Sequence, residues 1–240
     1  MAKPISLEKI LFSQGFGTRR YCADLVYADL VMVNGVLVDD PGERVATDGL
    51  ILNVEGKDWE YHEKAYIVFN KPPNYECSHK TTHHPSVYSL LPSPFIERGL
   101  QCVGRLDYDT TGLLLISDDG QFIHKMTTPK KNIGKVYHIT TPDPITEKQM
   151  DHLIKGVVLD DDPKPCFATA CEKISENGLA MTIVEGRYHQ VKRMMAAVGN
   201  HVEQLHRRQI GAYCMPADLA QGEWRWLYPD DLKQLSQSIK

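Results

Sequence analysis

The sequence lacks the cysteine and hydrophobic patterns that mark zinc-binding, disulfide-rich or membrane proteins. Its six cysteines are scattered without a CxxC pair, so they predict neither a zinc knuckle nor a disulfide framework. No run of about eighteen apolar residues occurs, and the N-terminal segment has no apolar stretch long enough for a signal peptide. We therefore expect a cytoplasmic protein with free thiols and no membrane contact.

The sequence also lacks the excess of positive charge that is typical of proteins that bind nucleic acid through bulk electrostatics. The formal net charge is −4, from 27 Lys and Arg against 31 Asp and Glu. The acidic excess lies in residues 1–60, where six Lys and Arg face ten Asp and Glu. Contact with nucleic acid should therefore depend on local groups of basic residues.

Motifs for nucleotides and metals are missing as well. There is no P-loop and no Rossmann glycine motif. The segment HKTTHHP places His79, His83 and His84 close together, but no carboxylate or cysteine set with familiar ligand spacing stands near them. We expect no metal and no cofactor, and a metal-dependent hydrolase built on these histidines is a weaker alternative.

Residues 1–60 predict a small α/β domain. An apolar repeat at helical spacing stops at Gly15, which is placed to end a helix. Thr18 is placed to cap a second helix. Asn34-Gly35 stands between β-branched residues and fits a two-residue hairpin turn. The chain changes character after this unit, which predicts a domain boundary near residue 60.

Residues 61–240 predict a larger α+β domain without internal repeats. Residues 113–117 (LLLIS) have the composition of a buried strand that ends at a turn in residues 118–120. Thr146, with a glutamine three residues later, resembles a capping box that opens a helix, and Gly156 would close it.

The segment GRLDYDTTGLLL concentrates polar residues between two apolar runs. Arg105, Asp107 and Asp109 stand within five positions of one another. Such a cluster is compatible with a tight polar turn whose aspartates stabilise the loop and whose arginine forms a surface ion pair. It is also compatible with a catalytic carboxylate, but spacing alone does not establish an active site.

The segment EGRYHQVKRMMAAVGN predicts a helix with two contrasting faces. From Val191 its apolar residues fall at i, i+3, i+4 and i+7, which forms one stripe toward the core. His189, Lys192 and Arg193 fall on the opposite face near the helix N-terminus, which favours an anion. A solvated charged face is the alternative. Asp107 would gain a charge partner if Lys192 faced it.

Taken in order, these segments resemble bacterial ribosomal RNA pseudouridine synthases of the small-subunit type. The resemblance spans nearly the whole chain and rests on FNKPPNYECS, GRLDYDTTGLLL, KVYHIT, EGRYHQVKRMMAAVGNHV and LHRRQIG, after an N-terminal segment similar to an S4 domain. It implies an α+β fold with a small S4-like α/β RNA-binding domain in residues 1–60. A catalytic domain in residues 61–240 would be built on a mixed, mainly antiparallel sheet with flanking helices.

The resemblance also implies roles for single residues. Asp107 would be the catalytic aspartate, and Arg105 would enter the space that the target nucleotide leaves. Tyr137 would lie against the target uracil. Lys192 would pair with the catalytic carboxylate, and Leu205 would pack beside the base.

A second group of residues is expected to support the site or to contact RNA. Asp109, Thr110 and Thr111 would shape the loop that presents Asp107. The candidate RNA contacts are Arg19, Arg20, Lys71, Arg187, His189, Arg193, His206 and Arg207, of which His206 and Arg207 are expected in a loop.

The expected activity is the isomerisation of one uridine of 16S ribosomal RNA to pseudouridine through a flipped-out nucleotide. We expect a monomer that acts on ribosomal RNA or on a small-subunit assembly intermediate. A synthase for 23S RNA and a non-catalytic S4-type ribosome assembly factor are the alternatives. Asp107 could act as a nucleophile at C1′ or as a base on a ribose hydrogen, and the sequence does not choose between these roles.

Overall fold

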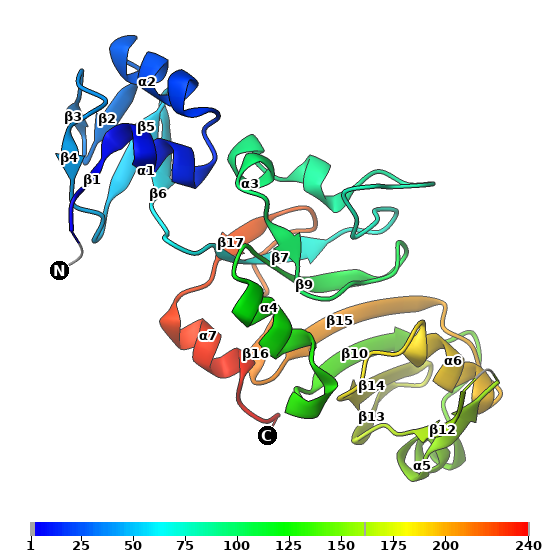
Figure 1. The fold of residues 1–240 in the computed structure, drawn as a ribbon. Helices are drawn as coiled ribbons and strands as arrows, with labels where there is room; N and C mark the ends of the chain where they lie inside the picture. Colours follow the sequence, from blue (N-terminus) through cyan, green and yellow to red (C-terminus); the bar gives the residue numbers. More distant parts are fainter. Residues whose placement is uncertain (1–2, 161, 240) are drawn as a thin grey trace. The chain divides into compact units, whose positions relative to one another are not determined.

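The computed structural model describes residues 3–160 and 162–239, which form two compact units (Figure 1). One unit runs to Ala65 and also contains Leu91–Gln101, and the other contains Tyr66–Leu90 and the chain from Cys102 onward. Leu91–Gln101 groups with the N-terminal unit because Phe95 packs against Trp59, with 5.0 Å between ring centroids.

The N-terminal unit has two helices near its start beside a small antiparallel sheet, and a third helix within Leu91–Gln101, and each expected local signal is present. Gly15 ends the first helix in the left-handed conformation, with a φ of 88°. The Thr18 side chain accepts a hydrogen bond from the backbone N–H of Tyr21 and so caps the second helix. Asn34 and Gly35 both have positive φ angles, 49° and 82°, as a hairpin turn of this type requires.

The elements of this unit are β1 (Ile5–Ser6), α1 (Leu7–Gln14), α2 (Arg19–Tyr27), β2 (Val31–Val33), β3 (Val36–Leu37), β4 (Arg44–Val45), β5 (Ile51–Val54), β6 (Lys57–Glu60) and α3 (Ser93–Glu97). The sheet has the order β3-β2-β5-β6, and β1 pairs with β4. Its core contains apolar side chains from both helices and the sheet, so this unit has a hydrophobic core of its own.

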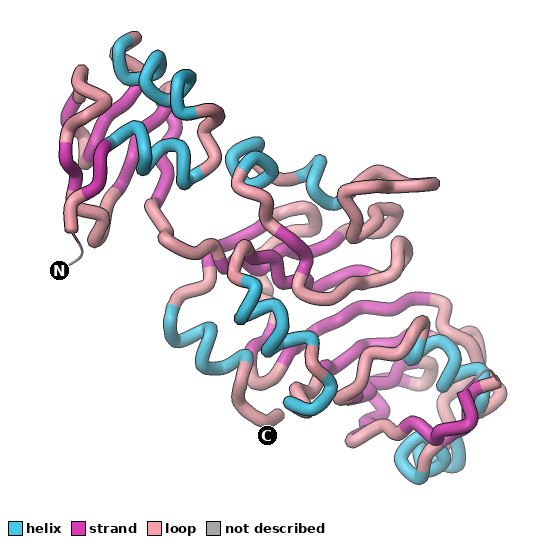
Figure 2. The backbone as a smooth tube through the Cα atoms, viewed as in Figure 1, coloured by secondary structure: helices cyan, strands magenta, loops and turns pink. Residues whose placement is uncertain are grey.

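The second unit is built on a nine-stranded, mainly antiparallel sheet in which β15 and β9 pair in parallel. Its strands are drawn in magenta in Figure 2. The order is β13-β14-β10-β15-β9-β7-β17, with β16 beside β15 and β8 beside β9. This mixed, mainly antiparallel sheet with flanking helices is the expected fold class.

Its strands are β7 (Tyr66–Lys71), β8 (Gln101–Cys102), β9 (Thr111–Ser117), β10 (Lys135–Thr140), β13 (Ala170–Ser175), β14 (Gly178–Ile183), β15 (Gln204–Ile210), β16 (Tyr213–Cys214) and β17 (Trp224–Trp226), with β11 (Val157–Leu159) and β12 (Asp162–Cys166) as a separate pair. Its helices are α4 (Gly120–Thr127), α5 (Glu147–Lys155), α6 (Gln190–Ala197) and α7 (Pro229–Leu235), with 3-10 turns at Val87–Leu90 and Pro129–Lys131.

Two local expectations for this unit need correction. Residues 118–120 do not form a simple turn, because the Asp119 side chain accepts a hydrogen bond from the N–H of Gln121 and caps α4. His206 and Arg207 do not lie in a loop but in β15, where they pair with β10 and β9. The capping box of α5 at Thr146 is confirmed.

The parallel junction between β9 and β15 lies in the middle of the sheet and positions the polar loop that precedes β9. Gly112 of β9 stands opposite Arg207 of β15. A Cβ atom on Gly112 would lie 2.5 Å from the Arg207 carbonyl oxygen, and its φ is 102°. Only glycine fits this close approach without strain.

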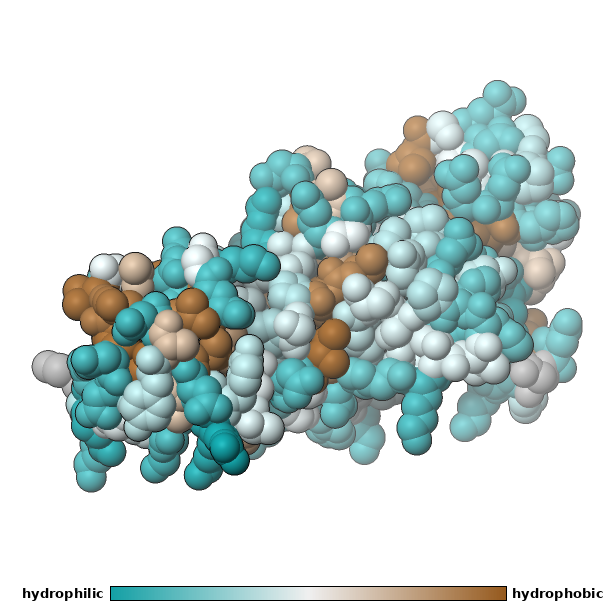
Figure 3. All heavy atoms as spheres, turned by 90° about the horizontal axis from the view of Figure 1, so that it is seen from above, coloured by the Kyte–Doolittle hydropathy of each residue, from teal (hydrophilic) through white to brown (hydrophobic). Residues whose placement is uncertain are grey.

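The surface seen in Figure 3 is mostly hydrophilic, with separate small groups of apolar side chains. Within residues 3–160 and 162–239, no helix has the length and the apolar character needed to cross a membrane.

Candidate active site

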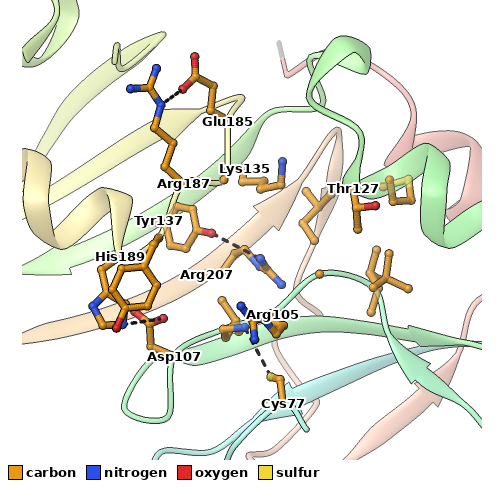
Figure 4. Close-up of a pocket in the computed structure, with 18 of the residues that line it drawn as sticks. Cys77, Arg105, Asp107, Thr127, Lys135, Tyr137, Glu185, Arg187, His189 and Arg207 are labelled. Carbon is orange, nitrogen blue, oxygen red and sulfur yellow. Dashed lines mark hydrogen bonds and ion pairs between the residues drawn. The ribbon is translucent and has the colours of Figure 1, made fainter. Parts of the chain in front are cut away.

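Two adjoining cavities of the second unit contain Asp107 in their walls. The larger has a volume of about 510 Å³ and the smaller about 90 Å³. Both are lined by Arg105, Leu106, Asp107, Tyr137, Gly186, Arg187 and His189. Figure 4 shows Arg105 and Asp107 on the loop before β9, Tyr137 on β10 and His189 before α6 around one space, whereas the Arg187 guanidinium points away toward Glu185.

A buried lysine holds the loop that carries Asp107. Lys71, at the end of β7, is fully buried, and its ammonium donates hydrogen bonds to the carbonyl oxygens of Pro72, Tyr108 and Thr110 at 3.0, 2.9 and 2.9 Å. Burial lowers the pKa of Lys71. Lys71 was expected to contact RNA, and this expectation is corrected: its charge is enclosed and holds the loop.

Asp107 faces two basic side chains of the opposite wall. Its Oδ1 lies 3.4 Å from His189 Nε2, and its Oδ2 lies 3.5 Å from Lys192 Nζ. The Lys192 ammonium is closer to Asp109, to which it donates hydrogen bonds of 2.6 and 2.8 Å. Lys192 is therefore shared between two carboxylates, and Asp109 does more than shape the loop, because it holds the lysine in place.

The helix that carries Lys192 has three of the four predicted stripe residues in place, whereas Val198, at i+7, lies at its C-cap and is only partly buried. Val191, Met194 and Met195 of α6 are buried. His189, in contrast, is not on the polar face of the helix but precedes it, with a φ of 46°. This left-handed conformation is uncommon for a residue with a side chain, and it directs the imidazole toward Asp107.

Tyr137 and Leu205 lie on neighbouring strands and are both nearly buried, each 7% exposed. Tyr137 lines both cavities and Leu205 the smaller one. Arg207 stands opposite Tyr137 in the sheet and donates a hydrogen bond of 3.4 Å to its hydroxyl. An aromatic face, an aliphatic side chain and a carboxylate thus border one space.

Two of the expected RNA contacts are engaged by protein atoms. Arg207 is only 3% exposed and donates to the Leu113 carbonyl oxygen at 2.7 Å. Arg187 forms ion pairs with Glu185 and Asp162 at 2.7 and 2.9 Å and also donates to backbone carbonyls of β12. We correct the expectation for Arg207, because its guanidinium is buried, whereas RNA contact by Arg187, whose side chain is 21% exposed, stays a prediction.

The other expected RNA contacts differ in accessibility. Arg105 is exposed and lines both cavities. Arg193 donates to the Tyr188 carbonyl oxygen at 3.1 Å. His206 lies 3.0 Å from the Thr111 hydroxyl, and burial lowers its pKa. Arg19 and Arg20 are exposed on α2 of the N-terminal unit.

Three cavity residues, Cys77, Lys135 and Tyr188, were not predicted as site residues although each stands in one of the quoted segments, because their position in the cavity wall depends on tertiary contacts. Cys77 accepts a hydrogen bond from the backbone N–H of Leu106, and a hydrogen bond from Cys102 lowers its pKa. Burial, and then the charge of Arg207, lowers the pKa of Lys135 to about 8. Tyr188 lines the larger cavity next to His189.

Hydrogen bonds to a carboxylate and a ring stack hold the histidine-rich segment of residues 79–84. The Glu76 carboxylate accepts hydrogen bonds from the backbone N–H groups of Thr82, His83 and His84. His79 stacks on Tyr88, with 3.7 Å between ring centroids. In the part of the chain that the structure describes, no group of three His, Cys, Asp or Glu side chains is placed to hold a metal ion.

Comparison with known families shows the family of the chain that carries the two Asp107 cavities. The profile of the RNA pseudouridylate synthase family matches residues 65–197, which contain Asp107, Tyr137 and Lys192. The chain belongs to this family. The S4 domain profile matches residues 6–51, so the RNA pseudouridylate synthase unit follows an S4 domain.

Individual RNA pseudouridylate synthases resemble the chain over nearly its full length. Ribosomal small subunit pseudouridine synthase A of Escherichia coli (strain K12) is 38% identical, with 94% of this chain and 97% of that protein covered. The protein of the same name from Vibrio parahaemolyticus is 35% identical with the same coverage. A crystal structure of a pseudouridylate synthase superposes with a TM-score of 0.68 at 33% identity, covering 96% of this chain and 99% of that one.

Proposed function

We propose that this RNA pseudouridylate synthase converts one uridine of 16S ribosomal RNA to pseudouridine, with Asp107 as its catalytic carboxylate. The observation that carries the assignment is the position of Asp107 where two cavities meet, within 3.5 Å of His189 and Lys192. Relatives that are named for the ribosomal small subunit and match nearly the whole chain support the choice of RNA. The resemblance of the sequence to small-subunit pseudouridine synthases and the fold of the chain support the same proposal.

The reaction is a balanced rearrangement of one nucleotide. The bond between uracil N1 and ribose C1′ breaks, the base turns, and C5 bonds to C1′. C5 then loses its proton and N1 gains one, so the product has the same atoms as the substrate. No electron is gained or lost overall, and we therefore expect no redox cofactor.

Asp107 is the group of this site that could start the rearrangement. As a nucleophile it would attack C1′ and release the base, and as a base it would remove a ribose hydrogen. Lys192 and His189 would hold the two carboxylate oxygens in position during either route. Asp109 would restrain Lys192, because its hydrogen bonds to the ammonium are shorter than the Lys192–Asp107 contact.

The target nucleotide must leave its stack to reach Asp107, which costs a few kcal/mol. Stacking of the uracil on Tyr137, at about 1–3 kcal/mol, would offset part of that cost. Leu205 would close the other side of the base, and the exposed Arg105 would fill the place that the nucleotide leaves. The larger cavity, of about 510 Å³, has room for a nucleotide.

RNA binding extends, in this proposal, beyond the cavity. We assign RNA binding outside the cavity to the S4 unit of residues 1–60, with Arg19 and Arg20 as phosphate contacts, and catalysis to residues 61–240. The net charge of the whole chain, −4, fits a protein that orients a defined RNA rather than one that binds any RNA. We further propose that it acts as a monomer in the cytoplasm.

The catalytic role of Asp107 is tested with purified protein and a small-subunit ribosomal RNA transcript or assembly particle. Wild-type protein should form pseudouridine at one uridine, and Asp107→Asn should form none within the detection limit, on the order of 10³-fold below wild type. The melting temperature of the variant should be close to that of wild type, because Asp107 lies at a cavity wall. Normal activity of Asp107→Asn would refute the assignment.

The choice of RNA is tested by mapping pseudouridine in both ribosomal RNAs from cells with and without the gene. We expect one site in 16S RNA to disappear. A site lost from 23S RNA would replace the substrate assignment, and an unchanged map would contradict it.

A further inference from the structure

Two exposed tyrosines flank Asp107 at the larger cavity. Tyr188 is 71% exposed and Tyr108 is 46% exposed, and both line that cavity. Tyr108 follows Asp107 in the chain, whereas Tyr188 comes from the opposite wall, in the segment between β14 and α6. Exposed aromatic rings on both sides of a carboxylate are not needed for the core of the protein, since neither ring is buried.

The Tyr188 ring is held by a histidine that also contacts the carboxylate. Tyr188 stacks on His189 with ring centroids 3.8 Å apart and 21° between the planes. The same imidazole lies 3.4 Å from Asp107. The Tyr188 carbonyl oxygen also accepts a hydrogen bond from Arg193. One face of the tyrosine ring is therefore supported, and the high exposure places its remaining surface in solvent.

The Tyr108 ring has a similar support from an unrelated segment. It stacks on His84 with ring centroids 4.3 Å apart and 5° between the planes. His84 is brought there by Glu76, whose carboxylate accepts a hydrogen bond of 3.0 Å from its backbone N–H. The Tyr108 carbonyl oxygen accepts from Lys71 and from Asn74, at 2.9 and 2.7 Å. This arrangement fixes both the backbone and the ring.

We propose that Tyr108 and Tyr188 are stacking platforms for the two unpaired bases that flank the uridine turned into the cavity. The proposal rests on the function assigned above and names further residues that position its substrate. When a nucleotide leaves a stack, each neighbouring base loses one stacked face. A tyrosine ring replaces that face for any base, because every base presents a π surface. The histidines hold the two rings in place before RNA arrives, which reduces the entropy lost on binding.

The platforms predict a preference for single-stranded RNA around the target. Bases that remain paired in a helix cannot leave it to stack on a protein ring. Tyr108 and Tyr188 should therefore contribute to RNA affinity, measured as Kd or KM, far more than to the chemical step. This separates them from Asp107, whose loss should abolish the reaction.

The test combines tyrosine variants with altered RNA. The probe is a short single-stranded RNA with one uridine, either intact or lacking the base on its 5′ or its 3′ side, and binding is measured by fluorescence anisotropy. Tyr188→Ala and Tyr108→Ala should each weaken binding of the intact RNA about tenfold. Each should have little effect on the RNA that lacks the base on one side, and the side should differ between the two variants.

Matched variants distinguish stacking from folding effects. Tyr188→Phe and Tyr108→Phe keep the ring and should bind within about twofold of wild type. Tyr228 is 46% exposed, like Tyr108, but does not line either cavity, so Tyr228→Ala should not change binding. Tyr188→Leu keeps bulk without a π face and should resemble Tyr188→Ala.

Two results would overturn the proposal. One is equal weakening of intact and base-deleted RNAs by the alanine variants, and the other is a loss in the phenylalanine variants as large as in the alanine variants. Because this assay measures binding alone, it is separate from the activity assay. A protein that stacks these bases but forms no pseudouridine would refute the proposed function and not the platforms.

Discussion

Single residues in this site owe their roles to partners that are distant in the sequence. Lys71 and Lys192 are both lysines beside the Asp107 loop, yet one is sealed under the loop and the other faces two carboxylates. The same residue type thus serves as a structural anchor in one place and as a charge partner in the other. Burial and hydrogen-bond partners decide which role applies.

Lys135 shows the cost of a charge in the cavity wall. Its pKa is lowered from 10.5 to about 8, first by burial and then by Arg207. Between these two pH values the unfolded chain binds more protons at this position than the folded protein does. Raising the pH through this window should therefore stabilise the folded state.

This pH dependence can be isolated with Lys135→Met. We expect the free energy of unfolding of wild type, relative to that of the variant, to rise between pH 8 and pH 10.5. The rise should be at most about 3 kcal/mol. Urea denaturation of both proteins over this range measures it. A difference that is constant with pH, or that falls, would contradict the expected sign.

At the scale of elements, the junction of β9 and β15 holds the Asp107 loop in place. It is the parallel contact in an otherwise antiparallel sheet, and it brings Thr111 beside His206 and Gly112 beside Arg207. The Asp107 loop leads directly into this contact, and Tyr137 lies on β10 at the far side of β15. The distance between the carboxylate and the aromatic ring thus depends on the register of three strands.

Gly112→Ala should disturb this register. The added Cβ would meet the Arg207 carbonyl oxygen at 2.5 Å and the His206 ring at 2.8 Å, at a φ of 102°. Backbone strain and overpacking together should lower the free energy of unfolding by roughly 2–4 kcal/mol and also reduce activity. Urea denaturation gives the first quantity and pseudouridine formation the second.

A glycine with free space around it provides the control. Gly120 begins α4, and a Cβ atom there would have no neighbour within 4 Å. Gly120→Ala should be neutral or slightly stabilising because alanine loses less entropy in a helix. If both substitutions had the same effect, the close approach at Gly112 would not explain its cost.

For the molecule as a whole, the distribution of acidic and basic residues bears on the proposed RNA binding. The chain carries a net charge of −4 and the acidic excess lies in residues 1–60, the part with the S4 match. For the proposed RNA binding by this unit we therefore expect a few placed cations to matter, such as Arg19 and Arg20, which are adjacent and exposed on α2. The two units have separate hydrophobic cores, which is compatible with the proposed division between RNA binding and catalysis.

The double variant Arg19→Ala with Arg20→Ala should weaken binding of ribosomal RNA. If each arginine neutralises one phosphate, the slope of log affinity against log salt should fall by about 1 to 2. The rate at saturating RNA should change little, because both residues are remote in sequence from the Asp107 loop. Salt titrations of Kd, together with kcat, measure these effects.

The control removes the same charge elsewhere. Lys148 and Lys155 are exposed on α5, and their double alanine variant should keep the wild-type salt slope. An equal fall in slope for both double variants would show that net charge, and not the position of Arg19 and Arg20, governs binding.

Much of the architecture could be predicted because its signals are local. Gly15, Thr18, the Asn34-Gly35 turn and the capping box at Thr146 each act through hydrogen bonds or φ angles within a few residues, and all are present in the structure. The apolar stripe of α6 was readable for the same reason. The capping role of Asp119 was not predicted, because an aspartate before a glycine suits a turn equally well.

The sequence by itself determined that a small α/β unit and a larger α+β unit form, and that polar motifs of an RNA pseudouridylate synthase follow in a fixed order. Only the tertiary structure decided that Lys71, Arg187 and Arg207 are occupied by protein atoms, that Lys192 is shared between Asp107 and Asp109, and that Tyr108 and Tyr188 flank the cavity. Local signals act over one turn of chain, whereas accessibility and ion pairing depend on strand register and burial between segments far apart. The sequence therefore shows that a basic residue carries a charge, and the fold decides which atoms that charge contacts.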